Sequence, residues 1–137
     1  MNARFWIAVA AIFVLSLGLE MIVHAGLLES EYSRLPGLFR AKETQASYFP
    51  WMLVAHALFA AGFVWIYRQG REPDKPWLGQ GLRYGAAIIV LLTIPGYLIY
   101  FAVQPLPWTL VTKQIVFDSL AVMIMAAAVA LMYRGER

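Results

Sequence analysis

Residues 108–133 read WTLVTKQIVFDSLAVMIMAAAVALMY, an apolar stretch that carries three strongly polar side chains, Lys113, Gln114 and Asp118. At about 1.5 Å of rise per residue, a helix of this length crosses a hydrocarbon core of about 30 Å. Charged and amide groups are costly in hydrocarbon, so in such helices they face a bundle interior or a functional site. The stretch therefore predicts a membrane-spanning helix that packs against others and brings polar groups to a shared interior.

The rest of the chain supplies the partners of this helix. Its 137 residues are 61% hydrophobic and 14% charged, with a mean hydropathy of +0.65. A soluble domain of this size has too little interior to bury that much apolar surface. Besides the helix over 108–133, we expect helices over about 5–28, 48–67 and 82–103. The prediction is one all-α domain, residues 1–137, folded as a bundle of four transmembrane helices.

Several local features refine the predicted segments. The first run resembles a signal peptide, but it carries Glu20 and His24, which secretion does not need, so we expect it to be retained as a helix. Pro50 suits the first turn of the second helix. The segment 68–81 has the Gly, Pro and Asp of a solvated turn. Pro95 predicts a kink in the third helix.

Orientation follows from the basic residues, which are more frequent on the cytoplasmic side of membrane helices. One side of the predicted bundle carries seven of them: Arg4, Arg68, Arg71, Lys75, Arg83, Arg134 and Arg137. The other side carries Arg34, Arg40 and Lys42. We therefore expect both termini to be cytoplasmic and the long loop 29–47 to lie outside, as an amphipathic lid or as a solvated loop. Because the basic residues form no patch, no nucleic-acid partner is expected.

The ionisable and amide side chains inside the predicted helices fall in the outer half of the bilayer. They are Glu20, His24, His56, Lys113, Gln114 and Asp118. The spacing of Glu20 and His24, and of Gln114 and Asp118, places each pair on one helix face. We expect a ligand- or ion-binding site formed by Glu20, His56, Gln114, Asp118, Tyr97 and Tyr100. His24 and Lys113 are expected at its periphery. The alternative is that these groups only hold the helices together.

Four functions remain open at this point. The first is binding or transport of a small molecule or ion, coupled to protons, by a homo-oligomer. The second is a cofactor protein: haem b on the two histidines, a divalent metal on His24, His56 and Glu20, or a quinone beside His56, Tyr97 and Tyr100. The third is an accessory subunit of a membrane complex. An enzyme is the least supported, since the sequence has no phosphate-binding loop, nucleophile elbow or HExxH motif.

Two stretches carry a family resemblance. They are YFPWMLVAHALFAAGFVWIY, residues 48–67, and PGYLIYFAVQPLPWTLVTKQIVFD, residues 95–118. Both resemble segments of small four-span proteins of the bacterial cytoplasmic (inner) membrane. The resemblance implies a multi-pass protein of that membrane, with the lipid bilayer as its first partner. It implies no activity.

Overall fold

A computed structural model describes residues 2–135, and this part of the chain is helical with no β-strand. The elements are α1 (Ala3–Glu20), η1 (Met21–Leu27), α2 (Glu29–Ser33), α3 (Lys42–Gly70), α4 (Trp77–Ile88), η2 (Ile89–Thr93), α5 (Ile94–Val103) and α6 (Trp108–Met132). The segments η1 and η2 are π-helical and continue α1 and α4. Four continuous helices, Ala3–Leu27, Lys42–Gly70, Trp77–Val103 and Trp108–Met132, are long and apolar enough to cross a membrane. The all-helical fold with four such helices is thereby confirmed.

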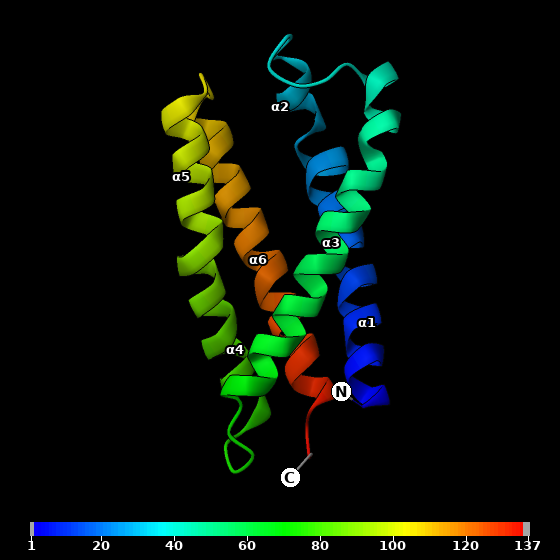
Figure 1. Cartoon of the computed structure of the whole chain (residues 1–137). Helices are drawn as coiled ribbons and strands as arrows, with labels where there is room; N and C mark the ends of the chain where they lie inside the picture. Colours follow the sequence, from blue (N-terminus) through cyan, green and yellow to red (C-terminus); the bar gives the residue numbers. More distant parts are fainter. Residues whose placement is uncertain (1, 136–137) are drawn as a thin grey trace.

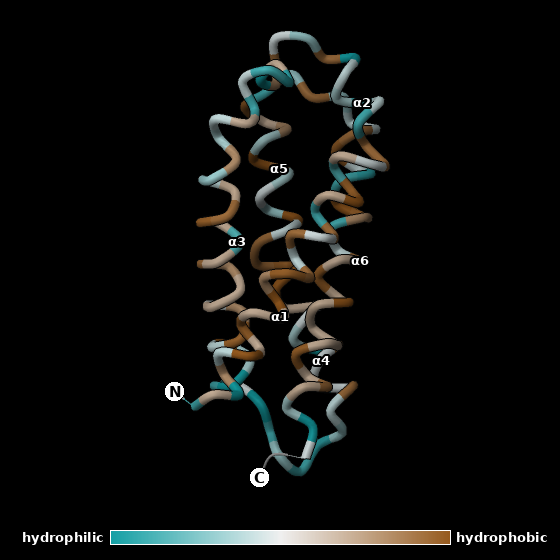
Figure 2. Tube along the Cα trace, turned by 90° about the vertical axis from the view of Figure 1, so that its right-hand side faces the viewer, coloured by the Kyte–Doolittle hydropathy of each residue, from teal (hydrophilic) through white to brown (hydrophobic). Residues whose placement is uncertain are grey.

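The helices run along one long axis, and the two ends of the bundle differ (Figure 1). Both chain ends and the connection at 71–76 lie at one end, here called the terminal end. The short helix α2 and the turn at 104–107 lie at the other, here called the loop end. Hydrophilic residues gather toward the two ends with apolar ones between them (Figure 2). This distribution suggests a membrane protein.

Helix α6 is the centre of the bundle. It packs against α1 and α4, and α3 packs on α1. Near the loop end, α3 and α5 lie on opposite sides of α6 (Figure 1). One buried cluster, around Ile12, Phe63 and Val129, fills the half toward the terminal end. A second, around Leu28, Leu106 and Leu110, closes the loop end.

The third membrane-crossing helix begins at Trp77, directly after Pro76, and not at Leu82 as predicted. Gly81, one of the glycines that indicated a turn in the sequence, serves helix packing together with Gly85. A Cβ atom at Gly81 would lie 2.9 Å from the carbonyl oxygen of Ala126, and one at Gly85 would lie 2.6 Å from the sulfur of Met123. Only glycine permits an approach this close, so the segment is helical because α6 packs against it.

The second helix is also longer than predicted, since α3 begins at Lys42 and Pro50 lies inside it. Residues 42–49 (KETQASYF) include several good helix formers, and they are exposed. An exposed proline costs this helix a hydrogen bond but does not end it. The loop expected over 29–47 is therefore a short helix, α2, followed by a connection and the first turns of α3.

Candidate functional site

His24 is the centre of the polar network, although the sequence placed it at the periphery. Its Nε2 lies 3.3 Å from the carboxylate oxygens of Asp118 and 3.6 Å from Oε1 of Glu20. His24 stands in the π-helical segment η1, and Glu20 is the last residue of α1. Asp118 reaches them from α6. Two carboxyl groups from different helices thus share one imidazole.

Two tyrosines complete the network. Tyr97 of α5 donates its hydroxyl to Oδ2 of Asp118. Tyr32 of α2 forms a hydrogen bond with Nδ1 of His24, and the two rings stack at 5.8 Å with an interplanar angle of 17°. Nε2 of Gln114 donates to the Tyr32 hydroxyl at 3.1 Å. The network therefore joins the three elements α1/η1, α5 and α6, and α2 covers it.

The hydrogen-bond directions follow from the donors available. An ionised carboxylate only accepts, so neutral His24 carries its proton on Nε2, toward Asp118 and Glu20. Nδ1 then accepts the Tyr32 hydroxyl, and Tyr32 in turn accepts from Gln114. In this series of hydrogen bonds, from Gln114 through Tyr32 and His24, each donor points toward the carboxylates. Gln114 is 6% exposed, and its Oε1 has no hydrogen-bond partner among the described residues.

Burial raises the pKa of Tyr32 to about 12, and the nearby Asp118 and Glu20 carboxylates add to this shift. A negatively charged phenolate would be poorly solvated here and would face two carboxylates. Tyr32 is consequently a neutral hydroxyl, able to donate to His24, at all physiological pH values.

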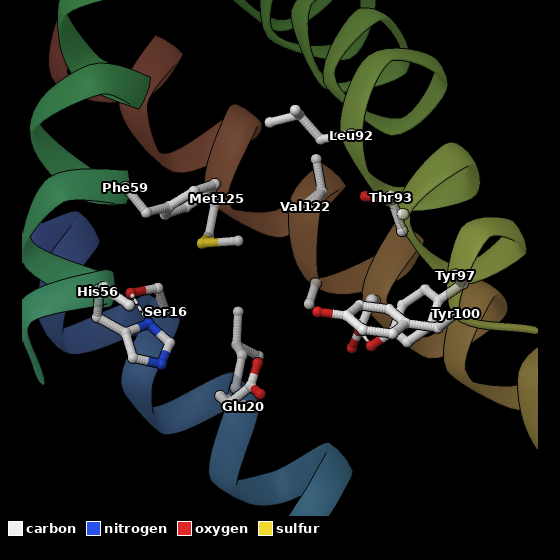
Figure 3. A pocket seen from close by; sticks show the side chains of 15 residues that line it. Ser16, Glu20, His56, Phe59, Leu92, Thr93, Tyr97, Tyr100, Val122 and Met125 are labelled. Atoms are coloured by element: carbon white, nitrogen blue, oxygen red, sulfur yellow. Dashed lines mark hydrogen bonds between the residues drawn. The ribbon is translucent and has the colours of Figure 1, made fainter. Parts of the chain in front are cut away.

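His56 has a different partner, because its Nδ1 lies 3.0 Å from the Oγ of Ser16. Ser16 donates its single hydroxyl proton to the Phe13 carbonyl at 2.9 Å. The proton between Ser16 and His56 must then come from Nδ1 of the histidine, which leaves Nε2 of a neutral His56 as an acceptor. His56 and Glu20 lie near one another (Figure 3).

A cavity of about 460 Å³ lies between the helices and includes part of the network in its wall. Its polar lining is Ser16, Glu20, His56, Thr93, Tyr97, Tyr100 and Asp118. The remaining lining is apolar or small: Leu19, Ala55, Phe59, Leu92, Gly96, Ala121, Val122 and Met125. Figure 3 shows Phe59, Val122 and Met125 on one side and Glu20 and the tyrosines on the other. The cavity is thus amphipathic, with one apolar side and one side that carries carboxyl groups.

Lys113 lies apart from the network. Its Nζ is 2.5 Å from Oε1 of Glu31 on α2. This hydrogen bond holds the pKa of the Glu31 carboxyl below its ordinary value. The pair fastens α2 to the start of α6. Lys113 therefore gives no positive charge to Glu20 or Asp118.

One group of described residues can hold a metal ion, namely Glu20, His24 and Asp118, whose ligand atoms all lie within 4.8 Å of one another. Asp118 takes the place that the sequence analysis had given to His56. A haem ligated by both histidines would require His24 to give up its hydrogen bond to Asp118 or to Tyr32. It would also require the His56 side chain, now hydrogen-bonded to Ser16, to turn toward the haem iron.

Two site residues escaped the sequence analysis as site residues. Ser16 is not among the predicted site residues, yet Ser16, Glu20 and His24 follow one another at four-residue spacing, which aligns them along a helix. Tyr32 lies in the predicted loop 29–47 and is not among the predicted site residues either. Its approach to His24 depends on α2 folding back over the bundle, for which the sequence has no direct signal.

The fold and the site define a class of protein: a bundle of four helices that are long and apolar enough to cross a membrane, with an amphipathic cavity and two carboxyl groups in its wall. Comparisons with protein-family models, with curated proteins and with solved structures give no match. The chemistry of the site itself is therefore the basis for a function.

Proposed function

We propose that this protein is an integral membrane protein that binds a small cation, as a ligand or as a step of transport, in the cavity beside Glu20 and Asp118. The positive-inside pattern supports both termini being cytoplasmic, with seven Lys and Arg residues on that side and three on the other. The family resemblance supports the bacterial cytoplasmic membrane. In this orientation the polar network lies in the outer half of the bilayer, and the cavity extends from it toward the middle, to Val122 and Met125.

The proposal rests on the net negative charge of the network formed by Glu20, His24 and Asp118. Glu20 and Asp118 have His24 as their ion-pair partner, and no lysine or arginine pairs with them in residues 2–135. When both carboxyl groups are ionised, two negative charges face at most one imidazolium. A net charge is costly inside a helix bundle unless it is balanced. Both carboxyl groups line the cavity, so a bound cation can supply the balance.

A divalent transition metal is a second candidate, favoured by the spacing of the donor atoms. Ligands about 2.1 Å from a tetrahedral metal ion lie about 3.4 Å apart. Nε2 of His24 is 3.3 Å from Asp118 and 3.6 Å from Glu20, which is close to that spacing. Metal binding would need the other tautomer of His24, with Nδ1 donating to Tyr32. Such an outer hydrogen bond is usual for metal-bound histidine.

Equilibrium binding to the purified protein in lipid nanodiscs tests the proposal. Three probe cations cover the classes: Zn²⁺, tetramethylammonium and tetraphenylphosphonium. We expect at least one to bind, and Glu20→Gln and Asp118→Asn each to weaken that binding about tenfold or more, because each removes a charge from a poorly solvated site. Glu72→Gln, which changes an exposed surface carboxylate, is the matched control and should bind as the native protein does. Binding of none of the probes, or equal binding by all variants, would contradict the proposal.

A further inference from the structure

We infer that the cation is a lipophilic organic monocation, and that it enters sideways between α3 and α5 from the hydrocarbon of the membrane. This inference rests on the proposed function and adds the chemical class of the ligand and its route.

The cavity is closed toward the loop end. Tyr32 lies over His24, and Leu28, Leu110 and Val111 form a buried cluster at that end of the bundle. The lining residues come from the four long helices, with none from α2 or from the turn at 104–107. A ligand arriving along the bundle axis from this side would have to displace packed side chains.

The cavity is also closed toward the terminal end. There the Tyr84 hydroxyl donates to the Phe63 carbonyl at 2.6 Å and ties α4 to α3. The rings of Phe63 and Tyr67 pack against Tyr84 in the buried cluster. Met125 and Val122 of the cavity wall belong to the same cluster. No route along the axis remains at this end without unpacking it.

The open side lies between α3 and the η2–α5 segment. Three lining residues are exposed at the outside of the bundle: Ala55 on α3, and Leu92 and Tyr100 at 52% and 54% exposure on the facing segment. Their exposed neighbours Leu58, Leu91 and Ile99 are all apolar. An opening in such a belt faces hydrocarbon when the helices span a bilayer.

The lining matches an amphipathic cation better than a bare ion. A metal ion needs the three ligand atoms alone, whereas the cavity holds about 460 Å³, within the usual range of small-molecule sites. Phe59 and Val122 offer apolar surface for the body of a ligand. Tyr97, which is hydrogen-bonded to Asp118, and Tyr100 add aromatic faces to the cavity wall, where a cation is further stabilised.

The test compares tetraphenylphosphonium with tetramethylammonium, which has the same charge and little apolar surface, in the nanodisc assay. We expect tetraphenylphosphonium to bind about tenfold or more tightly. Gly96→Phe should abolish its binding, because Gly96 lines the cavity and a Cβ there meets open space. Gly18→Phe is the matched control: Gly18 is exposed, a Cβ there also meets open space, and binding should be unchanged. Ala55→Trp at the rim should slow association in stopped-flow measurements.

Tetramethylammonium binding as tightly as tetraphenylphosphonium would overturn the ligand class, and so would Gly96→Phe binding like the native protein. An unchanged association rate for Ala55→Trp would overturn the lateral route. Binding of Zn²⁺ alone, lost in Glu20→Gln, would overturn this inference and leave the proposed function standing. Binding of none of the three cations would contradict both this inference and the proposed function.

Discussion

At the scale of single residues, His24 connects the two parts of the site. Its Nε2 faces the carboxylates that line the cavity, and its Nδ1 faces Tyr32, which lies outside the membrane-crossing helices. A metal ion bound to Nε2 of His24 would require Nδ1 to donate to Tyr32, in place of accepting from it. That change is felt at once by Tyr32 and then by Gln114. Metal binding by Glu20, His24 and Asp118 would thereby be linked to the seating of α2 through one imidazole.

Removal of the Tyr32 hydroxyl tests this arrangement. In Tyr32→Phe, His24 loses its donor and the buried Gln114 amide loses its acceptor. Leaving buried polar groups unpaired costs about 1–3 kcal/mol, so we expect the free energy of unfolding to fall by that amount. Denaturation in mixed micelles measures it. Tyr100→Phe is the control, because Tyr100 is largely exposed and should change stability little. Equal stability of Tyr32→Phe and the native protein would contradict the network.

At the scale of elements, two π-helical segments stand beside the site. The segment η1 carries His24, and η2 carries Leu92 and Thr93 of the cavity wall just before Pro95. Such segments often occur at functional sites, since they turn side chains away from the direction that a regular helix gives them. The kink expected at Pro95 is therefore preceded by a stretch of altered winding that faces the cavity.

The contact between α4 and α6 should depend on glycine at one position and not at another. In Gly81→Ala, the new methyl group would lie 2.9 Å from both the Ala126 carbonyl oxygen and the Ala130 Cβ, which forces the helices apart. We expect a loss of about 1–3 kcal/mol in unfolding free energy. Gly79→Ala lies two residues earlier in the same helix and meets open space, so it should be neutral or stabilising because alanine favours helix. Equal effects of the two variants would contradict the close approach.

The docking of α2 can be followed through the titration of Tyr32, whose pKa is raised from 10 to about 12. A raised pKa means that the neutral hydroxyl is favoured when α2 is docked. This contribution to docking is complete below pH 10 and is lost as the pH rises through about 12. The ultraviolet absorbance of tyrosinate, taken as the difference between the native protein and Tyr32→Phe, should show this late titration. A transition near pH 10 would mean that Tyr32 is exposed and α2 undocked.

At the scale of the whole molecule, the sequence predicts some parts of the structure better than others. The helix α6 agrees to within one residue, since Pro107 and Arg134 bound its apolar run. The start of α3 was missed because this helix continues beyond its apolar part. Counting residues along each predicted helix places Glu20 and Asp118 at a similar depth in the bilayer. Which polar side chains are in contact depends on the rotation of each helix, on the winding of η1 and on α2 folding back over the bundle. The hydropathy pattern of the sequence indicates none of these three.

The orientation of the molecule can be decided with single cysteines, because the native chain has none to interfere. Ser30 in α2 and Asp74 in the connection at 71–76 are exposed at opposite ends of the bundle (Figure 1). If the basic residues set the orientation, a membrane-impermeant maleimide added to intact bacterial cells should label Ser30→Cys and reach Asp74→Cys only after the membrane is permeabilised. Labelling both variants after denaturation controls for expression. The reverse pattern would place the termini outside and the cavity in the inner half of the bilayer. Labelling of both variants in intact cells would mean that the chain inserts in two orientations, and the asymmetric site would then open from either side.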